Sequence, residues 1–221
     1  SELTGCNIFG KAEYMNPGES VKDRAALFIV ENAIKNRSIS KGGTIVEGTA
    51  GNTGIGLAIV CKEYDLKLKI VIPKTQSIEK KETLKKLEAE LIEVEAVPYT
   101  DPKNYIKISK KIAEDLNKTN KNGVYWANQF DNTINTEAHI KTTAEEIWGQ
   151  TAGKVDAFTC AVGTGGTLAG ISIGLKNRNK NIKIALSDPM GSSLYYYVKT
   201  KKLQNSGSSI TEGIGTGRVT K

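Results

Sequence analysis

Residues 44–64, TIVEGTAGNTGIGLAIVCKEY, carry the pattern that decides the fold. Thr44–Glu47 is typical of a short strand, and the residues that follow form a glycine-rich loop. Thr53–Tyr64 then has the apolar spacing of a helix. A strand that enters a helix through a glycine loop is typical of α/β proteins. This stretch therefore predicts one strand–loop–helix unit of an α/β fold.

Strand patterns and helix patterns alternate along the whole chain in the same way. This order favours a parallel sheet that is covered by helices on both faces, and hence an α/β fold. The expected strands are residues 7–13, 44–47, 66–73, 91–95, 155–162 and 182–187. The expected helices are residues 20–37, 53–64, a polar segment ending near 89, a helix from 101 to about 120, 135–148, and a helix beginning near 167.

The composition excludes several classes of protein. With 38% hydrophobic and 25% charged residues among 221, the chain is not collagen-like, disordered or a disulfide scaffold. The net charge is +7, but lysines and glutamates are interleaved, as in residues 79–88. No basic run carries interleaved aromatic residues, so we expect no nucleic-acid partner. No run reaches 18 apolar residues, so we expect no membrane partner.

The cysteines and the histidine give no sign of a metal site. Cys6, Cys61 and Cys160 are widely spaced, and His139 is the only histidine. Zinc sites need several such ligands at close spacing, so we expect no bound metal. We expect buried free thiols and a reducing, cytoplasmic location. His139 is expected to be a structural histidine, because no catalytic triad can be built around it.

Two glycine loops stand at strand-to-helix junctions: residues 47–56, EGTAGNTGIG, and residues 163–170, GTGGTLAG. The N-terminus of the following helix offers free N–H groups and a partial positive charge, which suit a phosphate or a carboxylate. The alternative is that the glycines only allow tight turns and close helix packing. The dinucleotide pattern G-x-G-x-x-G fails at Leu168, and no P-loop is present. We expect a compact phosphorylated cofactor and a carboxylate substrate.

Residues 16–24, NPGESVKDR, place Lys22 where a loop enters a helix. A lysine that is partly desolvated near a helix N-terminus has a lowered pKa, so its neutral amine can attack a carbonyl group. Taken alone, Lys22 could be an ordinary surface residue. Together with both glycine loops, it favours Schiff-base chemistry.

These segments resemble the pyridoxal-phosphate β-substituting enzymes of the cysteine synthase and cystathionine β-synthase family. The resemblance implies that Lys22 is the catalytic residue and binds pyridoxal 5'-phosphate, and that Asn52 bonds the cofactor's phenolic oxygen. Gly213, in the segment EGIG at 212–215, corresponds to the family's backbone stretch beside the pyridine ring. The family's phosphate-binding loop corresponds to Gly163, Thr164, Gly165, Gly166 and Thr167.

The same resemblance implies a site for the substrate α-carboxylate. In this family a glutamine that matches Gln129 helps the first glycine loop to hold that group. Ala50 stands where the family usually has serine, so one hydroxyl is missing. Residues 188–192, DPMGS, are closer to the cystathionine β-synthase pattern. The implied substrate-binding residues of the loop are Thr49, Ala50, Gly51, Asn52 and Thr53.

For the fold, the resemblance implies a tryptophan synthase β-like architecture with two three-layer α/β units and mainly parallel sheets. The smaller domain is expected over residues 16–130, and the larger, cofactor-binding domain over residues 1–15 and 131–221. The family continues beyond a segment like residues 215–218 and supplies there a Ser or Thr for the pyridine nitrogen. We therefore expect this chain to be a fragment with an incomplete larger domain. A homodimer is expected.

The implied function is β-replacement on a serine-type amino acid, with O-acetylserine and sulfide giving cysteine and acetate. Cystathionine synthesis, which uses a thiol as the nucleophile, and serine or threonine dehydration share the early steps and remain alternatives. A family member with impaired catalysis is an alternative of another class. An NAD-dependent oxidoreductase is disfavoured because the dinucleotide spacing fails.

Overall fold

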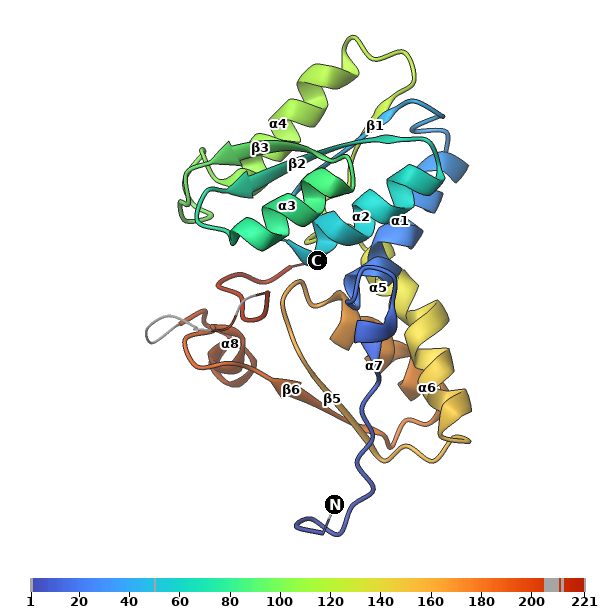
Figure 1. Cartoon of the computed structure of the whole chain (residues 1–221). Coiled ribbons are helices and arrows are strands. Elements are labelled where there is room, and N and C mark those ends of the chain that lie inside the picture. The colour runs from blue at the N-terminus through green and yellow to red at the C-terminus, as the bar shows by residue number, and fades with distance from the viewer. Residues whose placement is uncertain (1, 50, 205–210, 212, 221) are drawn as a thin grey trace.

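The computed structural model describes residues 2–49, 51–204, 211 and 213–220. Within these residues the strands form two separate parallel sheets (Figure 1). The first has the order β3-β2-β1-β4, built from Glu90–Val94, Lys67–Pro73, Thr44–Gly48 and Val124–Trp126. The second pairs β5 (Ala157–Ala161) with β6 (Lys183–Ser187). The predicted α/β fold with parallel sheets is confirmed.

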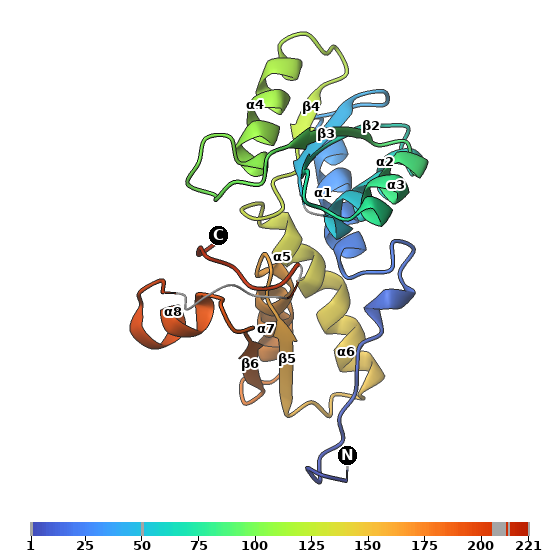
Figure 2. The same ribbon diagram turned by 60° about the vertical axis from the view of Figure 1, so that its left-hand side comes forward.

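Helices cover both faces of the first sheet. One face carries α1 (Lys22–Lys35), α2 (Asn52–Glu63) and α3 (Ile78–Lys86), and the other carries α4 (Tyr105–Asn117) (Figures 1 and 2). All five residues of β1 are buried, because β1 is a central strand between two helical layers. Ile45 packs toward α1 and α2, whereas Val46 packs toward α4. This alternation places the apolar core on both sides of β1.

The second sheet packs against α7 (Gly166–Arg178), and a long helical segment lies alongside α7. That segment was predicted as one helix, 135–148. It consists of α5 (Ile134–Ala138), a π-helical stretch (His139–Thr143) and α6 (Ala144–Gln150). The glycines of α7 allow the close approach, because a Cβ at Gly170 would lie 2.6 Å from His139 Cβ. On the other side of β5 and β6 from α6 lies α8 (Leu194–Thr200) (Figures 1 and 2).

The expected strand at residues 7–13 is wrong. Ile8 and Phe9 are 69% and 79% exposed, and no described strand pairs with this segment. A single 3₁₀ turn, Glu13–Met15, follows it. Alternating apolar residues make a strand only where a neighbouring strand receives their backbone hydrogen bonds.

The remaining expected elements are present with shifted ends, and two were missed. The helix expected from residue 101 begins at Tyr105, because the Asn104 side chain accepts a hydrogen bond from the Ile106 N–H at 3.1 Å and so caps the helix. β4 and α8 were not predicted. The division into domains at residue 130 remains a prediction. Among the described residues, no helix is long and apolar enough to cross a membrane.

Candidate functional site

Lys22 is the first residue of α1 and is partly buried. Burial lowers the pKa of the ammonium group, with a smaller opposing effect of the Cys160 thiol on β5. The charge of Lys22 in turn helps to lower the pKa of His139. The helix α1 contacts the π-helical stretch, and a lowered pKa of Lys22 favours its neutral, nucleophilic amine.

The loop Gly163–Thr167 joins β5 to α7 and has the geometry of an anion site. Gly165 has φ +94°, which a residue with a side chain rarely adopts, and it directly precedes α7. α7 is 13 residues long, so its first N–H groups and dipole are available to an anion. A Cβ at Gly163 would lie 2.4 Å from the carbonyl oxygen of Gly213. Gly213 thus lies next to the loop.

A hydrogen-bonded histidine orients the last residue of this loop. His139 Nε2 lies 3.1 Å from the Thr167 hydroxyl, and Nδ1 lies 2.9 Å from the Thr143 hydroxyl. The ring is buried, and burial together with the charges of Lys22 and Arg24 lowers its pKa to about 4. His139 is therefore a neutral, satisfied structural histidine, but it also contacts the predicted phosphate-binding loop.

The first glycine loop connects β1 to α2. The Thr49 hydroxyl accepts a hydrogen bond from the Gly51 N–H at 3.2 Å. The Thr53 hydroxyl donates to Gln129 Oε1 at 2.5 Å, so the structure brings these two predicted carboxylate ligands together. Asn52 is exposed at the start of α2, whereas Thr49 and Thr53 are buried. Ala50 lies outside the described residues.

One buried amide connects the turn that carries Gln129 with the second glycine loop. Asn135 Nδ2 donates to the Gln129 carbonyl at 3.0 Å and to the Thr164 hydroxyl at 3.0 Å. A Cβ at Gly166 would lie 2.4 Å from Asn135 Oδ1, so glycine is needed there. Asn135 was not predicted as a site residue, since an asparagine near a helix start is indistinguishable by sequence from an ordinary cap.

The C-terminal segment (Figures 1 and 2) contacts the second glycine loop and the turn that carries Gln129. The Gly215 N–H donates to the Val162 carbonyl at 2.7 Å, and the Thr220 hydroxyl donates to the Thr164 carbonyl at 2.6 Å. The Arg218 guanidinium pairs with Asp131 at 3.1 Å and lies 5.1 Å from the centre of the Phe130 ring. This segment therefore contacts both the predicted phosphate-binding loop and the turn that carries Gln129. Glu212 lies outside the described residues.

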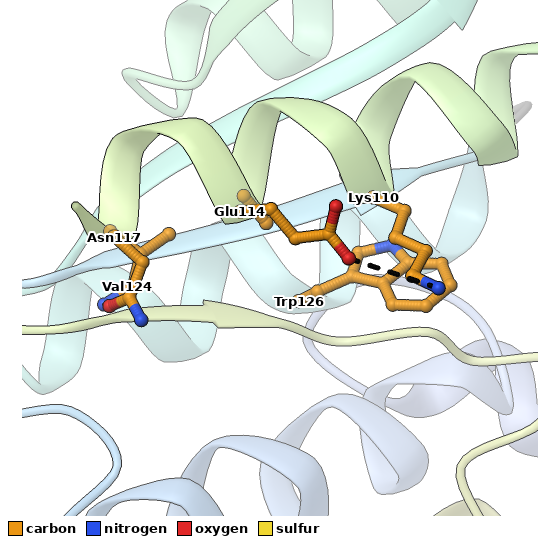
Figure 3. Close-up of a pocket in the computed structure, with 6 residues that line it drawn as sticks. Lys110, Glu114, Asn117, Val124 and Trp126 are labelled. Atoms are coloured by element: carbon orange, nitrogen blue, oxygen red, sulfur yellow. Dashed lines mark hydrogen bonds and ion pairs between the residues drawn. The ribbon is translucent and has the colours of Figure 1, made fainter.

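A separate hollow of about 150 Å³ lies between α4 and β4 (Figure 3). In it the Lys110 ammonium lies 5.9 Å from the centre of the Trp126 ring and 3.8 Å from a Glu114 oxygen. None of the predicted site residues lines this hollow. Across the described residues, no cluster of three His, Cys, Asp or Glu side chains could hold a metal ion.

The site as a whole suits a phosphorylated carbonyl compound. A glycine-rich loop at the N-terminus of α7 offers backbone donors to a phosphate, and the partly desolvated Lys22 offers an amine to a carbonyl carbon. His139 hydrogen-bonds Thr167 of the loop, and the charge of Lys22 helps to lower the pKa of His139. The individual roles of Lys22, Asn52, Gln129 and the glycine-loop residues remain predictions.

Known proteins of similar sequence align with most or all of this chain. The chain is 54% identical to cysteine synthase 1 of Emericella nidulans, with all of this chain and 59% of that protein covered. It is 45% identical to a cysteine synthase of Dictyostelium discoideum, with 90% of this chain and 52% of that protein covered. The chain thus spans somewhat more than half the length of these relatives.

Solved structures agree with this result. A hydrogen sulfide-producing enzyme of Fusobacterium nucleatum matches with a TM-score of 0.79 at 39% identity, over 93% of this chain and 64% of that one. An O-acetylserine-dependent cystathionine β-synthase of Helicobacter pylori matches with a TM-score of 0.80 at 35% identity, over 93% of this chain and 63% of that one. The family described as pyridoxal-phosphate-dependent enzyme matches residues 1–221. The chain therefore belongs to the family of pyridoxal-phosphate-dependent enzymes.

Proposed function

We propose that this protein catalyses β-replacement on a serine-type amino acid, with O-acetylserine and sulfide giving cysteine and acetate. The observation that carries the proposal is the glycine loop at the N-terminus of α7, which His139 and Asn135 hold by hydrogen bonds, together with Lys22 at the start of α1, whose pKa is lowered by burial. The proposal is further supported by the names of the relatives, which are cysteine synthases at 54% and 45% identity.

The cofactor would be held at both ends by this chain. The N–H groups of Gly163–Thr167 would bind its phosphate, with the hydroxyls of Thr164 and Thr167 as further donors. Asn52 would bond its phenolic oxygen, and the backbone at Gly213 would lie beside its ring. Pyridoxal phosphate supplies an electron sink that makes the substrate Cα proton removable.

Lys22 would have two tasks. Its amine would anchor the cofactor's carbonyl carbon, and, once released by the incoming amino group, it would take the proton from the substrate Cα. Burial supports both tasks, because the lowered pKa leaves more of the amine neutral at a given pH.

The substrate carboxylate would bind at the start of α2. The loop Thr49–Thr53 would supply N–H groups there. The Thr53 hydroxyl donates to Gln129 Oε1, and the Gln129 amide also hydrogen-bonds the Glu47 carboxyl group, so that one Nε2 proton would be left for the substrate. Ala50 belongs to the same proposed set. An oriented amide next to a helix N-terminus provides two independent kinds of donor for one carboxylate.

The assembly and location are part of the same proposal. We propose two domains, residues 16–130 and residues 1–15 with 131–221, and a homodimer. Light scattering at several protein concentrations tests the dimer. The described cysteines are all free thiols, which supports a reducing, cytoplasmic location. A fluorescent fusion that localises to mitochondria would overturn that location.

A product assay tests the function. The full chain is loaded with pyridoxal phosphate and given O-acetylserine with sulfide or with homocysteine, and released acetate, cysteine and cystathionine are measured. We expect cysteine and acetate in equal amounts with sulfide, and none in Lys22→Ala. Lys35→Ala, at the exposed far end of the same helix, is the control.

The alternatives give other outcomes in this assay. Cystathionine from homocysteine as the main product would identify the activity that the Helicobacter pylori structure is named for. Keto acid from serine or threonine without a second substrate would identify a dehydratase. Absence of both cofactor uptake and product would identify a family member with impaired catalysis.

A further inference from the structure

Glu47 is a buried acidic residue that has no role in the proposed reaction. It is the fourth residue of β1, two positions before Thr49, and its side chain is 1% exposed. Burial raises its pKa to about 8. The carboxyl oxygen Oε2 has no hydrogen-bond partner among the described residues. An uncompensated buried carboxyl group is costly, so its presence at this position calls for a physical reason.

The other carboxyl oxygen holds the turn that follows β4. Glu47 Oε1 accepts a hydrogen bond from the Gln129 N–H at 3.4 Å, and the Asn128 N–H also bonds to this carboxyl group. Asn128 has φ +48°, in the left-handed region. Two successive N–H groups that point at one acceptor form a small anion-binding concavity. Glu47 thus fills the concavity of the turn that presents Gln129.

The sheet explains why a residue on β1 can reach this turn. β1 and β4 are parallel neighbours, with Val46 opposite Trp126, so Glu47 lies beside the point where β4 ends. At the next residue of β1, a Cβ at Gly48 would lie 2.7 Å from the Tyr105 carbonyl oxygen, so the start of α4 packs directly against this end of the strand. Burial raises the pKa of Tyr105, and the charge of Glu47 adds to this effect.

We propose that Glu47 is a positioning residue for the substrate-carboxylate site, because its carboxyl group fixes the Asn128–Gln129 turn and thereby keeps the Gln129 side chain against Thr53. This rests on the proposed function. The chain of contacts runs from Glu47 to the Gln129 backbone, and from the Gln129 side chain to the Thr53 hydroxyl. Glu47 itself touches neither cofactor nor substrate in this account.

The substitutions separate hydrogen bonding from packing. Glu47→Gln keeps an oxygen for the two N–H groups and has the shape of a neutral carboxyl group. Glu47→Leu keeps the volume but leaves both N–H groups buried without an acceptor. Glu47→Asp shortens the side chain and carries the test if the leucine variant does not fold. Glu90→Gln, at an exposed carboxylate on the same sheet, is the control.

The first measurement is amide hydrogen exchange by mass spectrometry on the cofactor-free chain, which does not depend on any activity. We expect exchange at residues 128–130 to be at least about tenfold faster in Glu47→Leu than in wild type, as for the loss of one net hydrogen bond. Glu47→Gln and Glu90→Gln should exchange at the wild-type rate. Wild-type exchange in Glu47→Leu would overturn the proposal, and so would equal acceleration in Glu47→Gln.

The second measurement is steady-state kinetics with O-acetylserine and sulfide on the loaded chain. In Glu47→Leu we expect KM for O-acetylserine to rise about tenfold while kcat stays within about threefold, because carboxylate binding is lost and the cofactor is not displaced. An unchanged KM would overturn the proposal. If wild type itself has no activity, the proposed function fails while the exchange result still decides whether Glu47 holds the turn.

Discussion

The imidazole of His139 and the hydroxyl of Thr167 form a hydrogen bond of 3.1 Å, although 28 residues separate them in the chain. Because the pKa of His139 is lowered to about 4, the ring is neutral at physiological pH and carries one proton. If that proton lies on Nε2, the ring donates to Thr167, and the Thr167 hydroxyl is left to donate to a phosphate. The Thr143 hydroxyl then donates to Nδ1.

Replacing His139 with leucine tests this relationship. We expect the Kd for pyridoxal phosphate to rise about tenfold, because the Thr167 hydroxyl loses the partner that orients it. Fluorescence titration of the cofactor-free chain measures the effect. Lys141→Ala, an exposed site in the same π-helical stretch, should leave the Kd unchanged. Wild-type affinity in His139→Leu would show that Thr167 needs no such support.

Gly165 tests the phosphate-binding loop itself. Valine at φ +94° is strained, and its Cβ would lie 3.3 Å from the Thr220 hydroxyl oxygen, so the loop would have to change its conformation. We expect Gly165→Val to weaken binding of pyridoxal phosphate by at least about tenfold, or roughly 1.4 kcal/mol. Gly149→Val is the matched control, since a Cβ at Gly149 has no neighbour within 4 Å. Equal affinity of wild type and Gly165→Val would place the phosphate elsewhere.

Glu47 makes stability depend on pH in a defined direction. Below pH 4.5 its carboxyl group is neutral in both states, but between 4.5 and about 8 it ionises only in the unfolded chain. The wild type should therefore lose stability relative to Glu47→Gln as the pH rises through this range, by up to about 5 kcal/mol. Urea unfolding of both proteins at pH 5 and pH 8.5 measures the difference. A difference that does not change with pH would mean that Glu47 is ionised in the folded protein.

Arg218 joins the C-terminal segment to the turn after Gln129. Its guanidinium lies 4.4 Å from the centre of the Tyr99 ring and pairs with Asp131 at 3.1 Å. Arg218→Ala should lower the free energy of unfolding by about 1–2 kcal/mol through loss of a partly buried ion pair and its ring contact. Proteolysis within residues 211–220 should become faster. Lys202→Ala, an exposed site, is the control, and unchanged proteolysis in Arg218→Ala would speak against a fastening role.

Local sequence patterns were sufficient to predict that the sheets are parallel. Each of the first three strands (β1, β2 and β3) has an apolar pattern and is followed by a helix. This alternation of strand and helix predicts that the strands are parallel. β4 has only three residues and gives no measurable period. The segment at residues 7–13 has the right alternation but lacks a described partner strand. Periodicity reports which residues can be buried, and pairing depends on the rest of the fold.

Residues that act through long-range contacts were not accessible from the sequence. Glu47 and Gln129 are 82 residues apart, and Asn135 and Thr164 are 29 apart. Each of these residues is of a type that is common at its position in a strand, loop or helix, and only the fold brings it into contact with its partner. By contrast, Lys22 and the two glycine loops could be proposed as site residues because backbone freedom and helix N-termini are visible in the sequence itself.

The most direct test is to find where pyridoxal phosphate attaches. The loaded chain is reduced with sodium borohydride, digested and mapped by mass spectrometry, so that the lysine bound to the cofactor carries a permanent pyridoxyl group. The account predicts this group on Lys22. A Cβ at Gly51 would lie 2.8 Å from Lys80 Cδ, so Lys80 is a second lysine near the first glycine loop and serves as the internal comparison. A pyridoxyl group on Lys80, or on no single lysine, would contradict the account.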